Sequence, residues 1–232
     1  MKSARTSAKL RPANPRGRPG AGRQPLTRDR IARAALELIE ANGLDEMSTR
    51  KLGAALGCEA MALYNHFPSK EAVLDGVVEL LIAKVELPPR EVCPFFDRVR
   101  GFARSFRALS QVYPRAFPLL ATRTFNTPSS LARLDAIFGE IADAGYSTQE
   151  AAYLVRIIGN YACGTGLDEL SRVRFAARQT AAVATADVSL PNLGAALPYM
   201  GPAHFDAVFE AGLDAILQGF HRSRAPGIDR DA

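Results

Sequence analysis

The spacing of apolar residues predicts helices along most of the chain from Thr27 onward. In the first of them, apolar residues recur at intervals of three and four, which places them on one buried face of an α-helix. This stripe consists of Ile31, Ala34, Ala35, Leu38 and Ile39. Thr27 is a favourable N-cap, and Asn42-Gly43 is a favourable helix end, so local chemistry predicts both boundaries.

Two short helices are predicted next. Ser48 or Thr49 caps the first, and Gly57 ends it. The second runs over about 59–66, where Pro68 prevents a simple continuation.

A long fourth helix, capped by Ser69, carries apolar residues through Val85 and ends before Pro88-Pro89. Further helices are predicted at about 94–112, 115–123, 128–144, 147–170 and 203–222. The Ala-rich segment 175–202, interrupted by prolines, is expected to be a loop with some helix of its own. Convincing strand patterns are absent, so the predicted fold class is all-α.

Residues 1–25 differ from the rest of the chain in charge and composition. The 232-residue chain has a net charge of +5, but this segment holds seven cations and no acid, which leaves the remainder at −2. Its Pro, Gly, Ala, Arg and Ser content cannot bury enough apolar surface to fold, so it is expected to be disordered. A basic arm on a mildly acidic body favours a polyanionic partner, with a solvated tail as the alternative.

Within this arm, Arg16-Gly17-Arg18-Pro19 matches the core of an AT-hook, in which arginines lie in a narrow A·T minor groove. Arg16 and Arg18 are therefore candidate minor-groove contacts. Nonspecific attraction to phosphates is the alternative, because a match of this length arises easily in a segment rich in Pro, Gly and Arg.

The sequence gives no indication of a membrane protein, a metal site or an enzyme. Every apolar run is too short to span a bilayer, and the basic N-terminus lacks the apolar stretch of a signal peptide, so a cytoplasmic protein is expected. Cys58, Cys93 and Cys163 lie too far apart for a zinc site or a disulfide framework. Gly164-Thr165-Gly166, the nearest approach to a phosphate loop, follows a helix rather than a strand. No metal, cofactor or catalysis is expected.

The segment 48–67, STRKLGAALGCEAMALYNHF, has the plan of a helix-turn-helix. Leu52, Leu56 and Leu63 are positioned to pack the two helices together, and Gly57 can adopt the positive φ of a tight turn. The second helix then presents its outer residues to a DNA major groove, which admits one helix and displays a distinct pattern for each base pair.

The same region carries a distinctive set of residues. It comprises the helix Ile31–Ile39, Gly43, Ser48-Thr49-Arg50, Leu52-x-x-x-Leu56-Gly57 and Leu63-Tyr64-x-His66-Phe67-x-x-Lys70-x-x-Leu74. With these features, residues 26–82 resemble the DNA-binding domain of the TetR family, the tetracycline-repressor family of bacterial regulators. The set is specific, because Leu-Tyr-x-His-Phe followed by a capped Lys rarely arises in an arbitrary pair of packed helices.

The resemblance implies two kinds of DNA contact. Phosphate contacts, which fix the register of the protein on the duplex, are assigned to Thr49, Arg50, Tyr64, His66 and Lys70. Base reading is assigned to Ala60, Met61, Ala62 and Asn65. The first three lack hydrogen-bonding side chains, so thymine methyl groups and groove shape are what they can read. Taken alone, these aromatic residues suit a core cluster of Tyr64, His66 and Phe67. Phe67 is expected to be part of the core, and for His66 both interpretations stay open.

Residues 90–222 resemble, more loosely, the C-terminal domain of the tetracycline-repressor branch, through Ser105-Phe106-Arg107 and Thr122-Arg123. The three histidines of the chain offer no counterpart to those that hold a metal–tetracycline complex in that branch, so this effector is not expected. A hydrophobic or aromatic small molecule is expected instead. The candidate ligand-binding residues are Phe102, Phe106, Arg107, Phe117, Thr122, Arg123, Phe138, Tyr153 and Asn160. The alternative is that they only fill a helical core.

The predicted helices 147–170 and 203–222 carry small residues that permit close packing of helices. An apolar ridge accompanies them, formed by Phe205, Phe209, Leu213, Leu217 and Phe220. In the family that the resemblance indicates, the matching helices of two subunits form a four-helix interface. A two-fold dimer places its recognition helices in successive major grooves, roughly 34–36 Å apart, so a palindromic operator is expected.

Four segments are predicted: a disordered basic arm at 1–25, a helix-turn-helix DNA-binding domain at 26–70, a helical ligand-binding and dimerisation domain at 71–222, and a disordered tail at 223–232. The expected function is that of a nucleoid-associated, homodimeric repressor that a small-molecule effector releases from a palindromic operator on double-stranded DNA. The alternative is an architectural DNA-binding protein that responds to no ligand.

Overall fold

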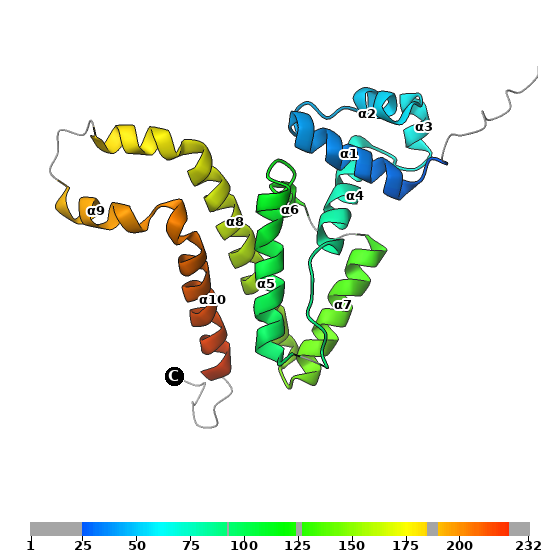
Figure 1. Cartoon of the computed structure of the whole chain (residues 1–232). Helices are drawn as coiled ribbons and strands as arrows, with labels where there is room; N and C mark the ends of the chain where they lie inside the picture. Colours follow the sequence, from blue (N-terminus) through cyan, green and yellow to red (C-terminus); the bar gives the residue numbers. More distant parts are fainter. Residues whose placement is uncertain (1–24, 92, 124–126, 185–189, 223–232) are drawn as a thin grey trace, which may run out of the picture.

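The computed structural model describes residues 25–91, 93–123, 127–184 and 190–222, and all regular structure in these ranges is helical (Figure 1). The α-helices are α1 (Arg28–Asn42), α2 (Thr49–Leu56), α3 (Ala60–Tyr64), α4 (Lys70–Ala83), α5 (Phe95–Val112), α6 (Leu119–Thr122), α7 (Pro128–Asp143), α8 (Thr148–Ala184), α9 (Pro191–Ala196) and α10 (Phe205–Arg222). The predicted all-α fold class is confirmed. The predictions for the arm and for the tail at 223–232 lie outside the described residues.

Helices α1 and α2 begin at capping residues that satisfy their first backbone N–H groups. The hydroxyl of Thr27 accepts a hydrogen bond from the backbone N–H of Arg30. Ser48, rather than Thr49, caps α2 by accepting from the backbone N–H of Lys51. Serine and threonine favour this capping hydrogen bond at the residue before a helix. The predicted starts of these two helices are therefore confirmed.

Two glycines make the turn between α2 and α3 possible. Gly57 ends α2 in the left-handed region, with φ 66°. Gly53, within α2, lies so close to the following segment that an added Cβ would stand 2.9 Å from the carbonyl oxygen of Cys58. The tight turn buries Leu52 and Leu63 between the helices, as the helix-turn-helix pattern predicts.

Helix α4 connects the small N-terminal unit to the larger helical domain. Its buried side chains pack against α1, and they are Val73, Leu74, Val77, Val78 and Leu81. The ring of Phe67 also lies against α4, where it fills the space beside Gly76. Phe67 is only 2% exposed, which confirms that it belongs to the core.

The second domain is built around α8, which contacts α5, α6, α7 and α10 (Figure 1). Three predicted helix ranges differ from the structure. The helix expected to run through Val85 ends at Ala83. The helix expected at 115–123 is confined to α6, and the helix expected to end at 170 continues to Ala184, which includes the start of the predicted loop 175–202. Alanine stabilises a helix without forming an apolar stripe, so periodicity alone missed this extension.

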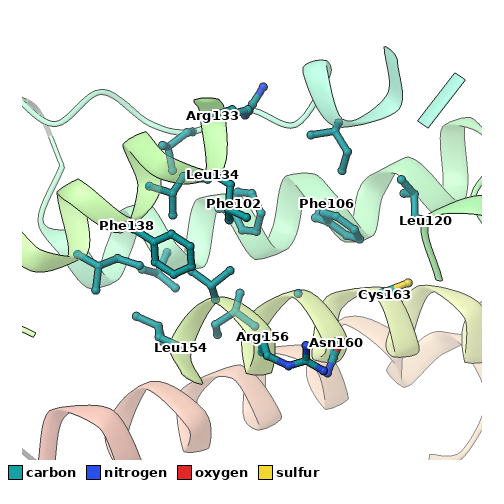
Figure 2. Close-up of a pocket in the computed structure, with 18 of the residues that line it drawn as sticks. Phe102, Phe106, Leu120, Arg133, Leu134, Phe138, Leu154, Arg156, Asn160 and Cys163 are labelled. Carbon is teal, nitrogen blue, oxygen red and sulfur yellow. The ribbon is translucent and has the colours of Figure 1, made fainter. Parts of the chain in front are cut away.

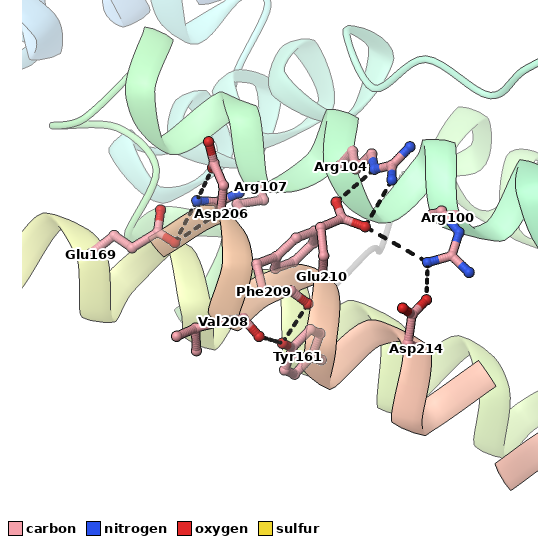
Figure 3. A network of polar contacts seen from close by, with 10 residues as sticks. All are labelled: Arg100, Arg104, Arg107, Tyr161, Glu169, Asp206, Val208, Phe209, Glu210 and Asp214. Atoms are coloured by element: carbon pink, nitrogen blue, oxygen red, sulfur yellow. Dashed lines mark hydrogen bonds and ion pairs between the residues drawn. The ribbon is translucent and has the colours of Figure 1, made fainter. Parts of the chain in front are cut away.

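Ion pairs fasten α10 to α5 (Figure 3). Arg104 binds Glu210 through two hydrogen bonds of 2.7 Å each, and Arg100 pairs with Asp214. The hydrogen bond from Arg104 is the main cause that holds the pKa of the Glu210 carboxyl below its ordinary value. These pairs are partly exposed, so they orient α10 more than they stabilise it.

A buried cluster joins the same helices to α8. Arg107 and Glu169 form a 2.8 Å ion pair in which both side chains are less than 10% exposed, and Asp206 pairs with the same guanidinium at 2.8 Å. Arg107 also lies over the ring of Phe209, 4.6 Å from its centroid. Burial lowers the pKa of the Arg107 guanidinium, but its hydrogen bonds to the two carboxylates outweigh this and raise the pKa.

Candidate DNA-binding surface and effector cavity

Helix α3 presents the predicted base-reading residues on the outside of the molecule. Figure 1 shows α2 and α3 on the outer side of α1, away from the second domain. Met61 is 71% exposed and Asn65 is also exposed, whereas Ala60 and Ala62 are partly buried. The outer surface of α3 is therefore formed mainly by Met61 and Tyr64, and Asn65 adjoins it with a polar side chain.

The predicted phosphate-contacting residues flank this helix. Thr49 and Arg50 occupy the first turn of α2, directly after its Ser48 cap. Lys70 opens α4, directly after a cap at Ser69, whose hydroxyl accepts from the backbone N–H of Ala72. First turns expose N–H groups and the positive end of the helix dipole, an arrangement that favours phosphate.

The aromatic residues between α3 and α4 divide into two environments. Tyr64 is 43% exposed beside Met61, whereas Phe67 is buried. His66 is partly buried, and its backbone carbonyl accepts a hydrogen bond from the guanidinium of Arg28, which also stacks over Phe67 at 4.1 Å. This role of Arg28 cannot be predicted from local spacing, because it depends on a contact across 38 positions of the chain.

A cavity of about 850 Å³ lies among α5, α7 and α8 (Figure 2). Its wall is mainly apolar, with Phe102 and Phe106 contributed by α5 and Leu134 and Phe138 by α7. This volume and lining are typical of sites that enclose a drug-sized molecule. None of the three histidines, all of which lie in the described chain, belongs to its lining.

The structure brings together five of the nine predicted ligand-binding residues at this cavity. They are Phe102, Phe106, Arg123, Phe138 and Asn160. It places the other four elsewhere: Arg107, Phe117, Thr122 and Tyr153. The sequence pattern therefore pointed to helices that line this cavity but did not separate cavity-facing side chains from core and surface ones.

Packing explains the positions of Phe117 and Arg107. Phe117 is fully buried and packs edge-on against Phe106, with ring centroids 6.2 Å apart, and close to Gly166. It supports the cavity wall from behind. Arg107 extends to α10 and α8, where the carboxylate of Glu169 binds it.

Thr122 and Tyr153 are held by local hydrogen bonds away from the cavity. The hydroxyl of Thr122 donates back into its own helix turn, to the carbonyl of Leu119. Tyr153 is 54% exposed, and its hydroxyl accepts from the amide of Gln149, one turn earlier on α8. Neither contact is visible in the spacing of apolar residues.

Three arginines outside the predicted set also line the cavity, and they are Arg98, Arg133 and Arg156. For Arg133 the signal was present in the sequence, because it precedes Ile137 and Ile141 on α7 by one and two helical turns and so shares their inward face. Cys163 lies in the wall as well, and burial raises the pKa of its thiol. A thiol that stays protonated is a poor nucleophile.

Two cavity arginines hold helix α4 near its two ends. One guanidinium N–H group of Arg123 lies 3.0 Å from the carbonyl of Glu71 and 2.6 Å from the carboxylate of Asp75. Arg133 donates to the carbonyl of Val85, just beyond the helix, at 2.6 Å. The wall of the cavity is therefore bonded directly to the helix that carries Lys70 at its start.

Two family models match this chain and together cover most of it. Residues 31–77 match the model for bacterial regulatory proteins of the tetR family, and residues 88–224 match the tetracyclin repressor-like C-terminal domain. The chain belongs to the TetR family of transcriptional regulators. The predicted family and its helix-turn-helix DNA-binding module are thereby confirmed.

Individual relatives agree with this assignment. The tetracycline repressor protein class A from transposon 1721 of Escherichia coli is 32% identical over 196 residues, which cover 84% of this chain and 90% of the relative. The crystal structure of the Streptomyces coelicolor TetR family protein ActR in complex with actinorhodin is 25% identical, with a TM-score of 0.75, and covers 87% of this chain and all of that one. Relatives of this TetR-family chain are transcriptional regulators rather than enzymes.

In the part of the chain that the structure describes, no helix combines the length and the apolar composition needed to cross a membrane.

Proposed function

We propose that this TetR-family regulator is a homodimeric repressor that binds a palindromic operator through α2, α3 and the start of α4, and that a hydrophobic small molecule in the cavity releases it. The resemblance assigns DNA contacts to the nine residues of the helix-turn-helix region given above, and the match to an AT-hook core adds Arg16 and Arg18 of the basic arm. The tetracycline repressors and the ActR complex with actinorhodin support a small-molecule effector.

The observation that carries the proposal is the direct bonding between the cavity wall and α4. A ligand changes DNA affinity only if it binds two forms of the protein with different affinities. A molecule that displaces Arg123 alters its contacts with Glu71 and Asp75, and so the position of α4. Because α4 begins at Lys70 and packs on α1, its movement changes the spacing of the two DNA-binding domains in the dimer.

A cavity-filling substitution tests the effector response. Leu134→Trp on α7 places a large ring in the cavity, so this variant is expected to bind operator DNA like the wild type but not to be released by a compound that releases the wild type. Genomic footprinting identifies the operator, and fluorescence anisotropy with and without candidate compounds measures the release.

Leu131→Trp is the matched control, because Leu131 lies on the same helix but is 50% exposed and does not line the cavity. Compounds that release the control and the wild type but not Leu134→Trp support the proposal. If compounds occupy the cavity and leave DNA affinity unchanged, the protein is an architectural DNA-binding protein instead.

The dimer is proposed to form through exposed faces of α8 and α10. Of the predicted apolar ridge, Phe209, Leu213 and Leu217 are buried within the protomer, so they hold α10 to its own domain rather than facing a partner. The exposed face of α10 is formed instead by Val208, Ala211, Ala215 and Gly219. Small residues in this register permit close approach of a second helix.

Ala215→Arg is expected to separate the protomers, because a two-fold interface places both introduced charges in the same buried contact. The dimer dissociation constant should rise by at least about a hundredfold. Sedimentation measures it, with Ala136→Arg on the exposed face of α7 as the control. A variant that remains dimeric like this control would place the interface elsewhere.

The remaining elements of the proposal follow from this function. The DNA-binding domain spans 26–70, the ligand-binding and dimerisation domain spans 71–222, and the basic arm at 1–25 adds affinity for DNA. The protein works without catalysis, in the cytoplasm, on the DNA of the nucleoid. Removal of residues 1–22 is expected to lower DNA affinity while leaving thermal unfolding unchanged.

A further inference from the structure

The cavity is apolar in most of its wall but carries an excess of positive charge. Among the described residues that line it, the charged ones are four arginines and a single carboxylate, Glu140. The arginines are Arg98, Arg123, Arg133 and Arg156. Such an excess is costly in an apolar environment unless an anion balances it.

Two of these arginines are neutralised within the protein. Arg98 lies 2.8 Å from the carboxylate of Glu140 and also donates to the carbonyl of Pro88. Arg123 pairs with Asp75 at 2.6 Å. The charges of these two arginines are therefore balanced by carboxylates of the protein itself.

The other two arginines have no such partner. Among the described residues, no carboxylate forms an ion pair with Arg133 or Arg156. Figure 2 shows them on opposite sides of the cavity, with the aromatic rings between them. Arg156 is exposed to water, but Arg133 is partly buried, and within the described part of the chain its one hydrogen bond goes to the neutral carbonyl of Val85.

We propose that the effector is an organic anion, with an aromatic or apolar body between Phe102 and Phe138 and an acidic group bound by Arg133. A guanidinium offers five N–H donors in a planar fork that matches a carboxylate or sulfonate. Its attraction for an anion is stronger at a partly buried position than in water. This inference rests on the proposed function, since it names the chemical class of the effector.

The same guanidinium connects the anion to the DNA-binding domain. Arg133 fastens the carbonyl of Val85 directly after α4. An acidic group that draws Arg133 toward the cavity competes with this hydrogen bond and loosens the end of α4. Charge recognition and release of DNA thus depend on one side chain.

A pair of fluorescent probes that differ in one group tests the proposal. Anilinonaphthalenesulfonate carries a sulfonate on an aromatic body, and N-phenylnaphthylamine has the same body without the charge. The wild-type protein is expected to bind the sulfonate at least about tenfold more tightly, as a charge-assisted hydrogen bond provides. Arg133→Met should abolish this preference and leave the affinity for the uncharged probe unchanged, and Arg133→Lys should restore part of it.

Arg90→Met is the control, because it removes one exposed arginine that lies outside the cavity lining and pairs with Asp143. It should preserve the preference for the sulfonate. Two results would overturn the proposal and leave the sensor function intact. The wild type could bind both probes with equal affinity, or Arg133→Met could lose the same fraction of its affinity for each probe. A different result would overturn the proposed function as well. If neither probe binds the wild type, and the same compounds release Leu134→Trp and the wild type from operator DNA, the cavity is not the effector site.

Discussion

Replacing Tyr64 and Lys70 together with alanine is expected to weaken binding to every DNA sequence by roughly a hundredfold at low ionic strength. The variant loses a charge-assisted hydrogen bond from Lys70 and a neutral one from the phenol of Tyr64, which together contribute about 2–4 kcal/mol to the binding free energy. The slope of log K against log salt should become shallower by about one, because only Lys70 carries a charge that releases a counterion. Fluorescence anisotropy over a range of salt concentrations measures both quantities.

The fold should survive this double substitution. Tyr64 is 43% exposed, and the ring that holds the segment in place is the neighbouring Phe67, which is buried. The cap of α4 is Ser69, which stays unchanged. Thermal unfolding is therefore expected to match that of the wild type.

Lys84→Ala provides the matched control, since it removes the same charge at the opposite end of α4, away from the recognition helix. Its DNA affinity and salt slope should remain close to those of the wild type. A double variant that binds DNA as tightly as this control would contradict the assignment of Tyr64 and Lys70 to the phosphate backbone.

The DNA-binding unit was largely predictable because its signals are local. Thr27, Ser48 and Ser69 each cap a helix by accepting a hydrogen bond from the backbone N–H three residues later. Such short-range signals can be read directly from a sequence. The close approach at Gly53 was not predictable from spacing, because it depends on how α2 meets the segment that follows Gly57.

The cavity was only partly predictable, for a physical reason that Phe106 and Phe117 illustrate. Both are large, apolar and buried, and their rings touch, yet one faces the cavity and the other supports its wall. The difference arises from Gly166 on α8, which makes room for Phe117. Periodicity identifies a buried face but not what lies opposite it.

The case of Arg107, one of the predicted ligand-binding residues, is similar. Its partner Glu169 lies 62 positions away, and Asp206 lies on yet another helix. Only the packing of α5, α8 and α10 brings these three charges together (Figure 3). The buried position of the pair gives this cluster a large effect on stability.

Arg107→Met is expected to lower the free energy of unfolding by about 3–5 kcal/mol, because it leaves the carboxylate of Glu169 buried without a counter-charge. This is a large fraction of the roughly 5–15 kcal/mol that stabilises a typical domain. Methionine keeps an apolar contact with the ring of Phe209, so the loss reflects charge rather than an empty space. Urea unfolding at one fixed protein concentration measures it, because dimerisation contributes to the apparent stability.

The double variant Arg107→Met/Glu169→Leu separates this explanation from a general packing defect. With both buried charges removed, the free energy of unfolding should return to within about 1–2 kcal/mol of the wild-type value, since apolar replacement of a buried pair is often neutral. Asp206 requires no partner in this variant, because its side chain is 88% exposed and stays hydrated. If instead the two substitutions add, the cluster stabilises the domain through shape alone, and the uncompensated carboxylate is not the cause of the loss.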